Sequence, residues 1–264
     1  MAFENRLLAA WARGDVTYGG WLSTSDVFIA EYMAAAGFDE ICVDQQHGAV
    51  DLRTIGPVFQ AIEGRGVVPT TRVATLDVAA IGKSLDMDAL GVIVPMVETP
   101  EQAAELVAAC RYPPHGVRSI GPTRAIYTIG LDLDDLARVA AIAMIETAAG
   151  LANVEAIARV PGLDAIYVGP GDLAIGLGLP VLPENRTAQQ AAVFSAAIDR
   201  IRAAADAAGI VTGAYVGTGA EAARYVARGF RMVTVAWDAG LIEDGGRVEL
   251  AVARGMGPAL KPGA

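Results

Sequence analysis

Eight short apolar segments alternate with alanine-rich stretches along almost the whole chain, and this alternation limits the folds open to it. The alanine-rich stretches begin at acid or hydroxyl caps and end near glycine, as helices do. Eight strands joined by helices predict an α/β fold in which parallel units close into a (β/α)8 TIM barrel. The predicted strands are 16–23, 40–44, 68–74, 91–97, 140–146, 163–169, 210–216 and 232–237, and the predicted helices are 25–36, 51–63, 100–110, 188–208 and 219–227.

A doubly wound open sheet is the alternative fold, but no G-x-G-x-x-G motif follows the first predicted strand. The chain has 264 residues, a common size for one barrel, and no linker or low-complexity segment divides it. We therefore expect one domain over residues 1–264, with the glycine- and proline-rich residues 255–264 as a loose tail.

Charge and composition exclude several classes of partner. The net charge of −10 argues against nucleic acid or an anionic membrane as a ligand. No apolar run approaches the roughly 20 residues that cross a bilayer, and Glu4 and Arg6 make the start of the chain unlike a secretory signal. Cys42 and Cys110 lie in apolar patterns and are expected to be reduced core residues. A cytoplasmic location is the expectation.

Two connections are long for a compact barrel, and long loops are commonly functional covers or subunit contacts. One follows the fourth predicted strand and contains 111–119, and the other follows the sixth and contains 176–183. His115 lies in the first, within Pro-Pro-His-Gly, and is interpreted as a surface residue.

The second predicted strand ends abruptly in polar residues, from Asp44 through two glutamines to His47 and Gly48. A strand buried on both faces has no structural need for them, whereas a barrel carries its active site at the carboxyl ends of its strands. His47 is one of only two histidines, so it is the main candidate for a proton-transferring imidazole.

Two carboxylates close the neighbouring fifth and sixth strands, Glu146 and Asp172. Adjacent strands lie about 4.8 Å apart, so the pair could chelate one hard divalent cation such as Mg²⁺ or Mn²⁺. The alternative is that Glu146 only pairs with Arg72 in the barrel mouth. A histidine-rich zinc site is nearly excluded because the chain has two histidines.

Arg72 ends an apolar strand, where a buried guanidinium needs an anionic or carbonyl partner, either a structural ion pair or a substrate. The turn from Gly169 to Leu173 leads into a short helix whose N–H groups could bind a carboxylate or phosphate. The segment 217–219 could bind phosphate, but a segment of this kind more commonly marks the start of a helix.

Only two lysines are present, Lys83 in a helical stretch and Lys261 near the end of the chain. A Schiff-base aldolase needs a lysine projecting from a strand into a dry pocket, and neither residue fits. Carbon–carbon bond chemistry on this chain would therefore need a metal.

These residues together resemble the HpcH/HpaI aldolase family, the metal-dependent class II pyruvate aldolases related to 4-hydroxy-2-oxoheptanedioate and 2-keto-3-deoxy-sugar-acid aldolases. The matching pieces run in order from about residue 18 to residue 238. They are Val43-Asp44-x-x-His47-Gly48, Arg72-Val73, Lys83-Ser84-Leu85-Asp86, Val94-Pro95-Met96-Val97-Glu98-Thr99, Arg111-Tyr112-Pro113-Pro114-x-Gly116-x-Arg118, Ile145-Glu146-Thr147 and Val168-Gly169-Pro170-x-Asp172-Leu173.

The resemblance implies roles for individual residues. Glu146 and Asp172 would bind Mg²⁺ or Mn²⁺, with Co²⁺ as a further option. His47 would be the acid/base, acting through a water and oriented by Asp44, and Arg72 would contact the pyruvyl keto oxygen. The substrate would also contact the backbone of the turn and an aromatic wall residue, at Gly169, Pro170, Gly171, Asp172 and Trp21.

The resemblance also implies a subunit arrangement. Family members are usually trimers or hexamers whose barrels exchange a helix, and the apolar segment 248–253 permits that. Asp86 matches a position that approaches the site of a neighbouring subunit. Two residues depart from the common pattern, because Gln46 replaces a glutamate and Asp88 replaces a glycine.

The implied activity is reversible cleavage of a 4-hydroxy-2-keto acid to pyruvate and an aldehyde, with the metal and Arg72 stabilising the enolate. A β-hydroxyacyl-CoA lyase, acting on esters such as malyl- or citramalyl-CoA, is the alternative within the superfamily. Such a lyase needs a cationic groove for the nucleotide phosphates. The small number of lysines and the net charge of −10 argue against such a groove. A non-catalytic carboxylate-binding barrel is the alternative from another class.

Overall fold

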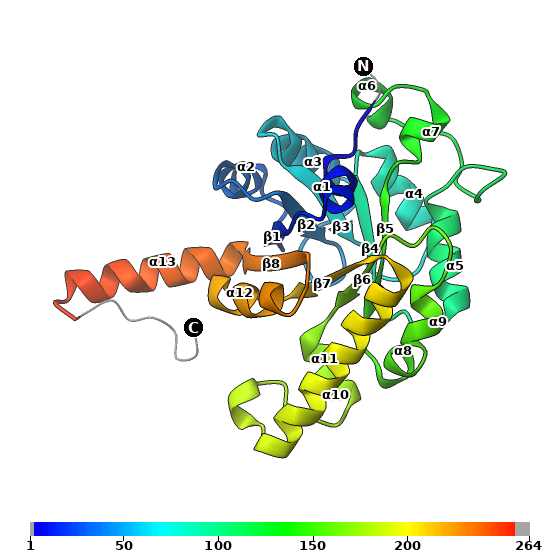
Figure 1. The fold of residues 1–264 in the computed structure, drawn as a ribbon. Coiled ribbons are helices and arrows are strands. Elements are labelled where there is room, and N and C mark those ends of the chain that lie inside the picture. The colour runs from blue at the N-terminus through cyan, green and yellow to red at the C-terminus, as the bar shows by residue number, and fades with distance from the viewer. Residues whose placement is uncertain (1–2, 257–264) are drawn as a thin grey trace.

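The computed structural model describes residues 3–256, which form a closed barrel of eight parallel strands in the order β1 to β8 (Figure 1). Strand β1 pairs with both β2 and β8, so the TIM-barrel prediction is confirmed and the open sheet is wrong. Each strand lies inside its predicted segment. The strands are β1 (Thr17–Leu22), β2 (Glu40–Asp44), β3 (Val68–Arg72), β4 (Gly91–Val94), β5 (Ala140–Ile145), β6 (Ala165–Val168), β7 (Val211–Tyr215) and β8 (Met232–Trp237).

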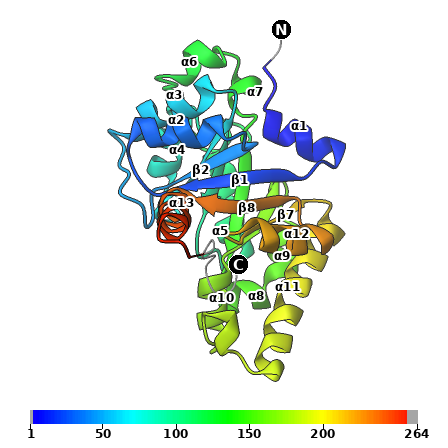
Figure 2. The ribbon, with the colours of Figure 1, turned by 90° about the vertical axis from the view of Figure 1, so that its left-hand side faces the viewer.

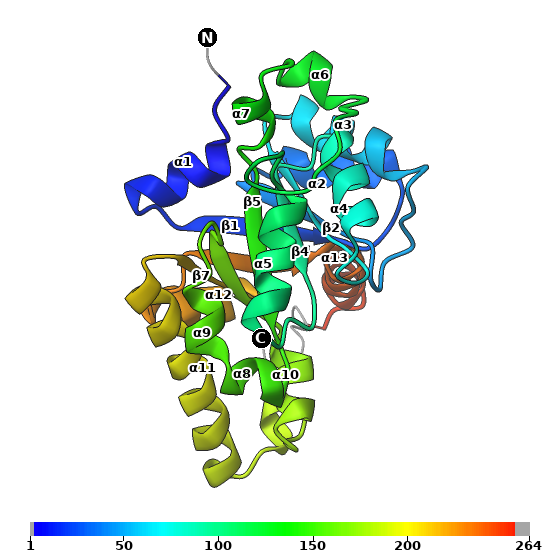
Figure 3. The same cartoon turned by 90° about the vertical axis from the view of Figure 1, so that its right-hand side faces the viewer.

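Helices follow the strands and cover the outside of the barrel (Figures 1 and 3). The helices are α1 (Arg6–Arg13), α2 (Val27–Ala35), α3 (Ile55–Gly64), α4 (Val78–Asp86), α5 (Pro100–Ala109), α6 (Ala125–Thr128), α7 (Leu133–Leu136), α8 (Ala148–Ala152), α9 (Val154–Ala158), α10 (Pro170–Gly176), η1 (Pro183–Asn185), α11 (Ala188–Ala208), α12 (Gly219–Ala227) and α13 (Asp238–Ala253).

Two helices begin later than the sequence predicts. Helix α2 starts after Asp26, whose carboxylate accepts the N–H groups of Phe28 and Ile29. Helix α3 starts at Ile55 instead of residue 51, because Asp51 caps a separate turn through the N–H groups of residues 53 and 54. Both shifts follow from an aspartate that satisfies N–H groups which the helix cannot bond.

The core has two parts, as expected for a barrel inside a ring of helices. Apolar side chains between the strands and the helices form the larger part. Inward-facing side chains fill the barrel interior, and Leu7 and Trp11 of α1 close its amino end. In Figure 2 the strands run from the end closed by α1 toward the end where α13 begins. Cys42 and Cys110 are buried free thiols, which confirms their predicted place in the core.

The long connection after β4 does not cover the carboxyl end of the barrel, contrary to one of the two expectations for it. It follows α5 and lies at the amino ends of the strands, where Arg111 Nη1 donates to the carbonyl of Val139 just before β5. It has a small core of its own, built from Tyr112, Ala125 and Leu136. His115 is exposed there, as predicted.

The last helix, α13, projects from the carboxyl end of the barrel and packs weakly against it (Figure 1). In the part of the chain that the structure describes, no helix is long and apolar enough to span a membrane. The predicted loose tail, 255–264, lies almost entirely outside the described residues.

Candidate active site

A cavity of about 410 Å³ opens at the carboxyl ends of the strands. It brings together most of the residues that the sequence predicts for the site, and its lining comes from seven of the eight strands and the loops that follow them. The lining residues are Trp21, Ser23, Asp44, His47, Arg72, Met144, Gly169, Pro170, Gly171, Asp172, Tyr215 and Trp237.

An ion pair between Asp44 and Arg72 stands at one side of this cavity. The residues are partners across the β2–β3 register, so their side chains leave neighbouring strands on the same face. Nε and Nη2 of Arg72 donate to the two carboxylate oxygens at 2.9 and 2.7 Å, and the guanidinium carbon lies 5.0 Å from the ring centre of Trp21. Trp21 also donates from Nε1 to Asp44 at 3.2 Å. The arginine is therefore held in one orientation.

The pair perturbs the acidity of both groups. Burial opposes ionisation of Asp44, but the hydrogen bonds and charge of Arg72 outweigh it and lower the pKa of the carboxyl. Burial likewise opposes the charge of Arg72, while Asp44 raises the pKa of the guanidinium. Both groups are charged at neutral pH. Arg72 forms its ion pair with Asp44 and not with Glu146, so the simple pairing of Arg72 with Glu146 is wrong.

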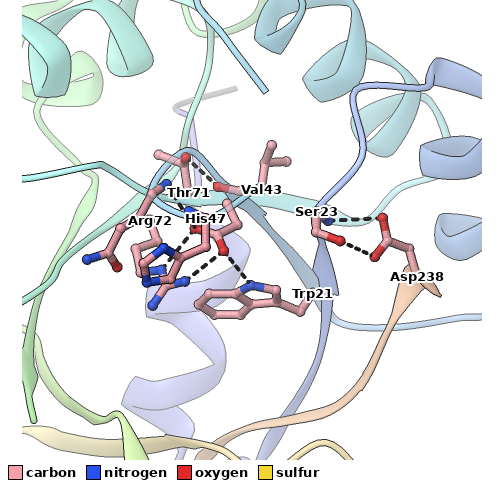
Figure 4. A network of polar contacts seen from close by, with 9 residues as sticks. Trp21, Ser23, Val43, His47, Thr71, Arg72 and Asp238 are labelled. Atoms are coloured by element: carbon pink, nitrogen blue, oxygen red, sulfur yellow. Dashed lines mark hydrogen bonds and ion pairs between the residues drawn. The ribbon is translucent and has the colours of Figure 1, made fainter. Parts of the chain in front are cut away.

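The loop that carries His47 is anchored by the same carboxylate. Asp44 Oδ1 accepts the N–H groups of Gln46 and His47 at 3.0 and 3.3 Å. Gly48 allows this tight path, because a Cβ there would lie 2.3 Å from the Asp44 carbonyl oxygen and 2.9 Å from that of Ser23. The structure thus shows Asp44 positioning the His47 backbone, while orientation of the His47 ring by Asp44 stays a prediction (Figure 4).

Gln46, which departs from the common family residue, buries its carbonyl oxygen Oε1 without a hydrogen-bond partner in the described structure. Its neighbour Gln45 instead uses its amide, donating to Thr71 and Ser84 at 2.9 Å each. Gln45 therefore ties the loop to β3 and α4, whereas no donor among the described residues reaches the Gln46 oxygen.

Glu146 is almost fully buried beneath the turn at Gly169. One carboxylate oxygen accepts the N–H of Met96 at 2.9 Å, but Oε2 has no partner among the described residues. A Cβ on Gly169 would lie 2.2 Å from that oxygen, so only glycine allows the approach. Burial raises the pKa of Glu146, and the nearby charge of Asp172 adds to the effect. A buried carboxylate oxygen without a partner, beside a second carboxylate, fits a divalent cation.

Asp172 lies in the first turn of α10, not at the end of β6 itself. Gly169 precedes the helix and Pro170 takes its first position, where the missing N–H costs nothing. The exposed N–H groups of Gly171 and Asp172 begin the helix on the cavity side, which suits an anion. No group of three or more histidine, cysteine, aspartate or glutamate side chains is arranged to hold a metal within residues 3–256, so a cation here would rest on two carboxylates and other oxygens.

Asp86 lies at the far end of its helix, at the amino side of the barrel, and pairs with Arg118 at 3.4 Å. It cannot reach the cavity of its own chain, and its contact with a neighbouring subunit stays a prediction. Asp88, in place of the common glycine, keeps a left-handed backbone with φ of 82°. Its buried carboxylate accepts the Thr128 hydroxyl at 2.6 Å and pairs with Arg124, so side-chain contacts hold the turn.

Sequence reasoning missed Ser23, Met144 and Trp237, which also line the cavity. Strand parity could have found Met144, because it stands two residues before Glu146 and shares its face. Ser23 and Trp237 directly follow or end a strand, as the predicted site residues do. Lys83 lies in α4 outside the cavity, so no described lysine is placed for a Schiff base.

Known proteins resemble this chain in sequence and in fold. A family model described as HpcH/HpaI aldolase/citrate lyase matches residues 17–244. A hydroxypyruvate/pyruvate aldolase from Rhizorhabdus wittichii is 35% identical over 254 residues, covering 96% of this chain and 100% of that protein. A 4-hydroxy-2-oxovalerate aldolase from Rhodococcus jostii is 37% identical and covers 79% of this chain and 81% of its own. The crystal structure of a family protein from Burkholderia cenocepacia matches with a TM-score of 0.86 at 32% identity, covering 95% and 100%.

Proposed function

The chain belongs to the HpcH/HpaI aldolase/citrate lyase family, and from this premise we propose that it cleaves 4-hydroxy-2-keto acids reversibly to pyruvate and an aldehyde. Relatives named as aldolases of pyruvate, hydroxypyruvate and 4-hydroxy-2-oxovalerate support the reaction class. The observation that carries the proposal is the common cavity. His47, Arg72 and the turn from Gly169 to Asp172 all line it, and Gly169 lies close to the buried Oε2 of Glu146, which has no partner among the described residues.

Glu146 and Asp172 are the residues that would hold a divalent cation, Mg²⁺ or Mn²⁺, since carboxylates are ligands such hard ions prefer. When bound, the cation supplies Lewis-acid stabilisation of the negative charge that develops on the keto acid. The remaining roles fall to the side chains and backbone of the chain itself.

Arg72 orients and stabilises the keto end of the substrate. Its hydrogen bonds to Asp44 use Nε and Nη2, which leaves Nη1 without a protein partner among the described residues. That N–H is free to donate to the keto oxygen and strengthens its bond as the oxygen becomes an enolate. The backbone N–H groups of Gly171 and Asp172 hold the substrate carboxylate at the start of α10.

His47 moves the proton. It accepts the proton of the C4 hydroxyl, directly or through a water, as the C4 oxygen becomes the aldehyde carbonyl. The electron pair of the breaking C3–C4 bond passes to the pyruvate enolate, which then takes a proton at C3. His47 is exposed at the cavity, so its ring can exchange that proton with solvent.

The acyl-CoA lyase alternative needs cationic side chains for the nucleotide phosphates. His47 and Arg72 are the basic residues that line the cavity within the described chain, and Arg72 is already paired with Asp44. This observation favours a small keto acid over an acyl-CoA ester. A non-catalytic carboxylate-binding barrel would have no use for a histidine that lines the same cavity as Arg72 and Asp172.

A panel of 4-hydroxy-2-keto acids tests the proposal. The purified protein is stripped of metal, Mg²⁺ or Mn²⁺ is restored, and pyruvate is measured with lactate dehydrogenase. We expect pyruvate release from at least one member only when metal is present. Malyl-CoA is tested in parallel, and cleavage of the ester alone would favour the acyl-CoA lyase. Binding of 2-keto acids without any turnover would favour the non-catalytic barrel.

A further inference from the structure

Three aromatic side chains, Trp21, Tyr215 and Trp237, line the cavity from the neighbouring strands β1, β7 and β8, and we call them the aromatic wall. Trp21 and Tyr215 meet edge to face with their ring centres 5.3 Å apart. Trp21 and Trp237 are partners across the β1–β8 register. A Cβ on Gly217 would lie 3.9 Å from the Tyr215 ring and 3.6 Å from the Trp237 ring, so both rings flank that glycine. The three rings therefore lie next to one another on three neighbouring strands.

Trp21 of the aromatic wall and Glu146 lie on opposite sides of the barrel. In a closed ring of eight strands β5 stands opposite β1, so Glu146 after β5 is across from Trp21 on β1. If the keto acid is held by Glu146, Asp172 and Arg72, its other half extends toward the aromatic wall. This step rests on the proposed function.

Among the residues that line the cavity, the cation beside the aromatic wall is Arg72, whose guanidinium carbon lies 5.0 Å from the Trp21 ring centre and which the proposed function assigns to the keto oxygen. Among the described lining residues, the charged or basic groups are Asp44, His47, Arg72 and Asp172. Arg72 already balances Asp44, and the pair stands on β2 and β3. An aldehyde with its own carboxylate would lose hydration against aromatic rings without gaining a counter-ion.

Ser23 lies next to the aromatic wall in the cavity lining, and Asp238 fixes the orientation of its hydroxyl. The Ser23 hydroxyl donates its proton to Asp238 Oδ1 at 2.6 Å, while Asp238 Oδ2 accepts the N–H groups of Ser23 and Thr24 at 3.0 and 2.8 Å (Figure 4). Asp238 is almost fully buried at the start of α13. Ser23 lines the cavity, and because its hydroxyl proton is committed to Asp238, its oxygen can act toward a ligand only as an acceptor, which suits a hydroxyl donor.

We propose that the aromatic wall together with Ser23 selects an uncharged, hydroxylated aldehyde as the second product, against an aldehyde that carries a carboxylate. Asp238 is a positioning residue in this assignment, because it acts through the Ser23 hydroxyl. The aldehyde hydroxyl donates to Ser23, and its carbon chain lies against the rings.

The charge preference is tested in the condensation direction, with pyruvate and Mg²⁺ or Mn²⁺. Succinic semialdehyde and its methyl ester have the same carbon chain and differ in charge. We expect kcat/KM for the ester to exceed that for the acid by at least about tenfold, since an unpaired carboxylate meets the rings. An acid that reacts as fast as the ester would overturn the charge preference.

The role of Ser23 is tested with glycolaldehyde and acetaldehyde, which differ by one hydroxyl. The ratio of their kcat/KM values should fall by about fivefold in Ser23→Ala, the effect of one neutral hydrogen bond, and Ser23→Thr should restore part of it. Ser119→Ala, on an exposed loop at the other end of the barrel, should keep the wild-type ratio. A ratio unchanged in Ser23→Ala would overturn the assignment of Ser23.

The set of aldehydes that react separates a failure of the aldol function from a failure of the selectivity. If none of the four aldehydes reacts with pyruvate under conditions where metal binds, that result would count against the proposed aldol function itself. Consumption that is fastest with the carboxylated aldehyde would leave the aldol function standing and overturn the selectivity.

Discussion

The Asp44 carboxylate accepts hydrogen bonds from Nε and Nη2 of Arg72 at 2.9 and 2.7 Å, and both side chains are nearly buried. The same carboxylate accepts the backbone N–H groups of Gln46 and His47. One acid therefore fixes the arginine proposed to contact the keto oxygen and the loop that carries the proposed base. Its removal should disturb stability and activity together.

Asp44→Asn should lower the free energy of unfolding by about 3–5 kcal/mol, because it leaves the Arg72 charge buried without its counter-ion. Urea denaturation measures the loss. Asp15→Asn is the matched control, since the Arg13–Asp15 pair is 62% and 51% exposed and should contribute less than about 1 kcal/mol. Equal losses in the two variants would mean that burial of the Asp44 pair has no energetic consequence.

His47→Ala should reduce aldol turnover by about a hundredfold or more, the usual contribution of a general base. Mn²⁺ affinity, measured by calorimetry, should persist because the carboxylates are untouched. His115→Ala controls for loss of an imidazole, since His115 is exposed at the opposite end of the barrel. Wild-type turnover in His47→Ala would remove His47 as the base.

Glu146→Gln should abolish the metal-dependent activity and weaken Mn²⁺ binding by at least about tenfold, as even indirect partners of a metal contribute that much. Glu155→Gln changes an exposed glutamate that pairs with Arg200 and should leave both properties unchanged. Full activity of the wild type after exhaustive chelation would exclude the metal assignment.

Glu40 should make stability fall as the pH rises. It is fully buried in β2, and burial raises its pKa to about 7, although the Thr70 hydroxyl at 2.6 Å opposes the shift. The folded state holds this proton more tightly, so the stabilisation is complete below the unfolded value of 4.5 and is lost as the pH rises to about 7. The full change is about 3 kcal/mol in order of magnitude.

The Glu40 effect is isolated by comparing urea unfolding of the wild type and Glu40→Gln from pH 4.5 to pH 8. Glutamine does not titrate, so the difference between the two proteins should change over this interval and level off above pH 7. A difference that is constant with pH would contradict the raised pKa.

Helix α13 should be part of a subunit interface, and the protein should sediment as a trimer or hexamer. It exposes Leu241, Ile242, Leu250 and Val252, which are 46% to 61% accessible, and covers little of the barrel. Ile242→Glu should shift the sedimentation coefficient toward smaller species, whereas Val193→Glu on α11 should not. A wild-type monomer at micromolar concentration would contradict the proposed assembly.

Much of the site was predictable because a barrel converts sequence order into position. Asp44, Arg72 and Glu146 end or follow their strands, so the rule that strand ends meet at one face brings them together without further information. The same rule failed for the segment 111–119, which was counted as following β4. It follows α5 instead, and a helix after a strand returns the chain to the amino end of the barrel.

The sequence by itself determined the number and order of strands, the absence of a Schiff-base lysine and the polar residues at the strand ends, because periodicity, caps and composition are local properties. Only the tertiary structure decided which charges meet. The β2–β3 register pairs Arg72 with Asp44, and Glu146 Oε2 is then buried without a partner among residues 3–256. The sequence alone is compatible with several ion pairs between the charged residues at the strand ends. The strand register and the close packing of the closed barrel determine which of these pairs forms.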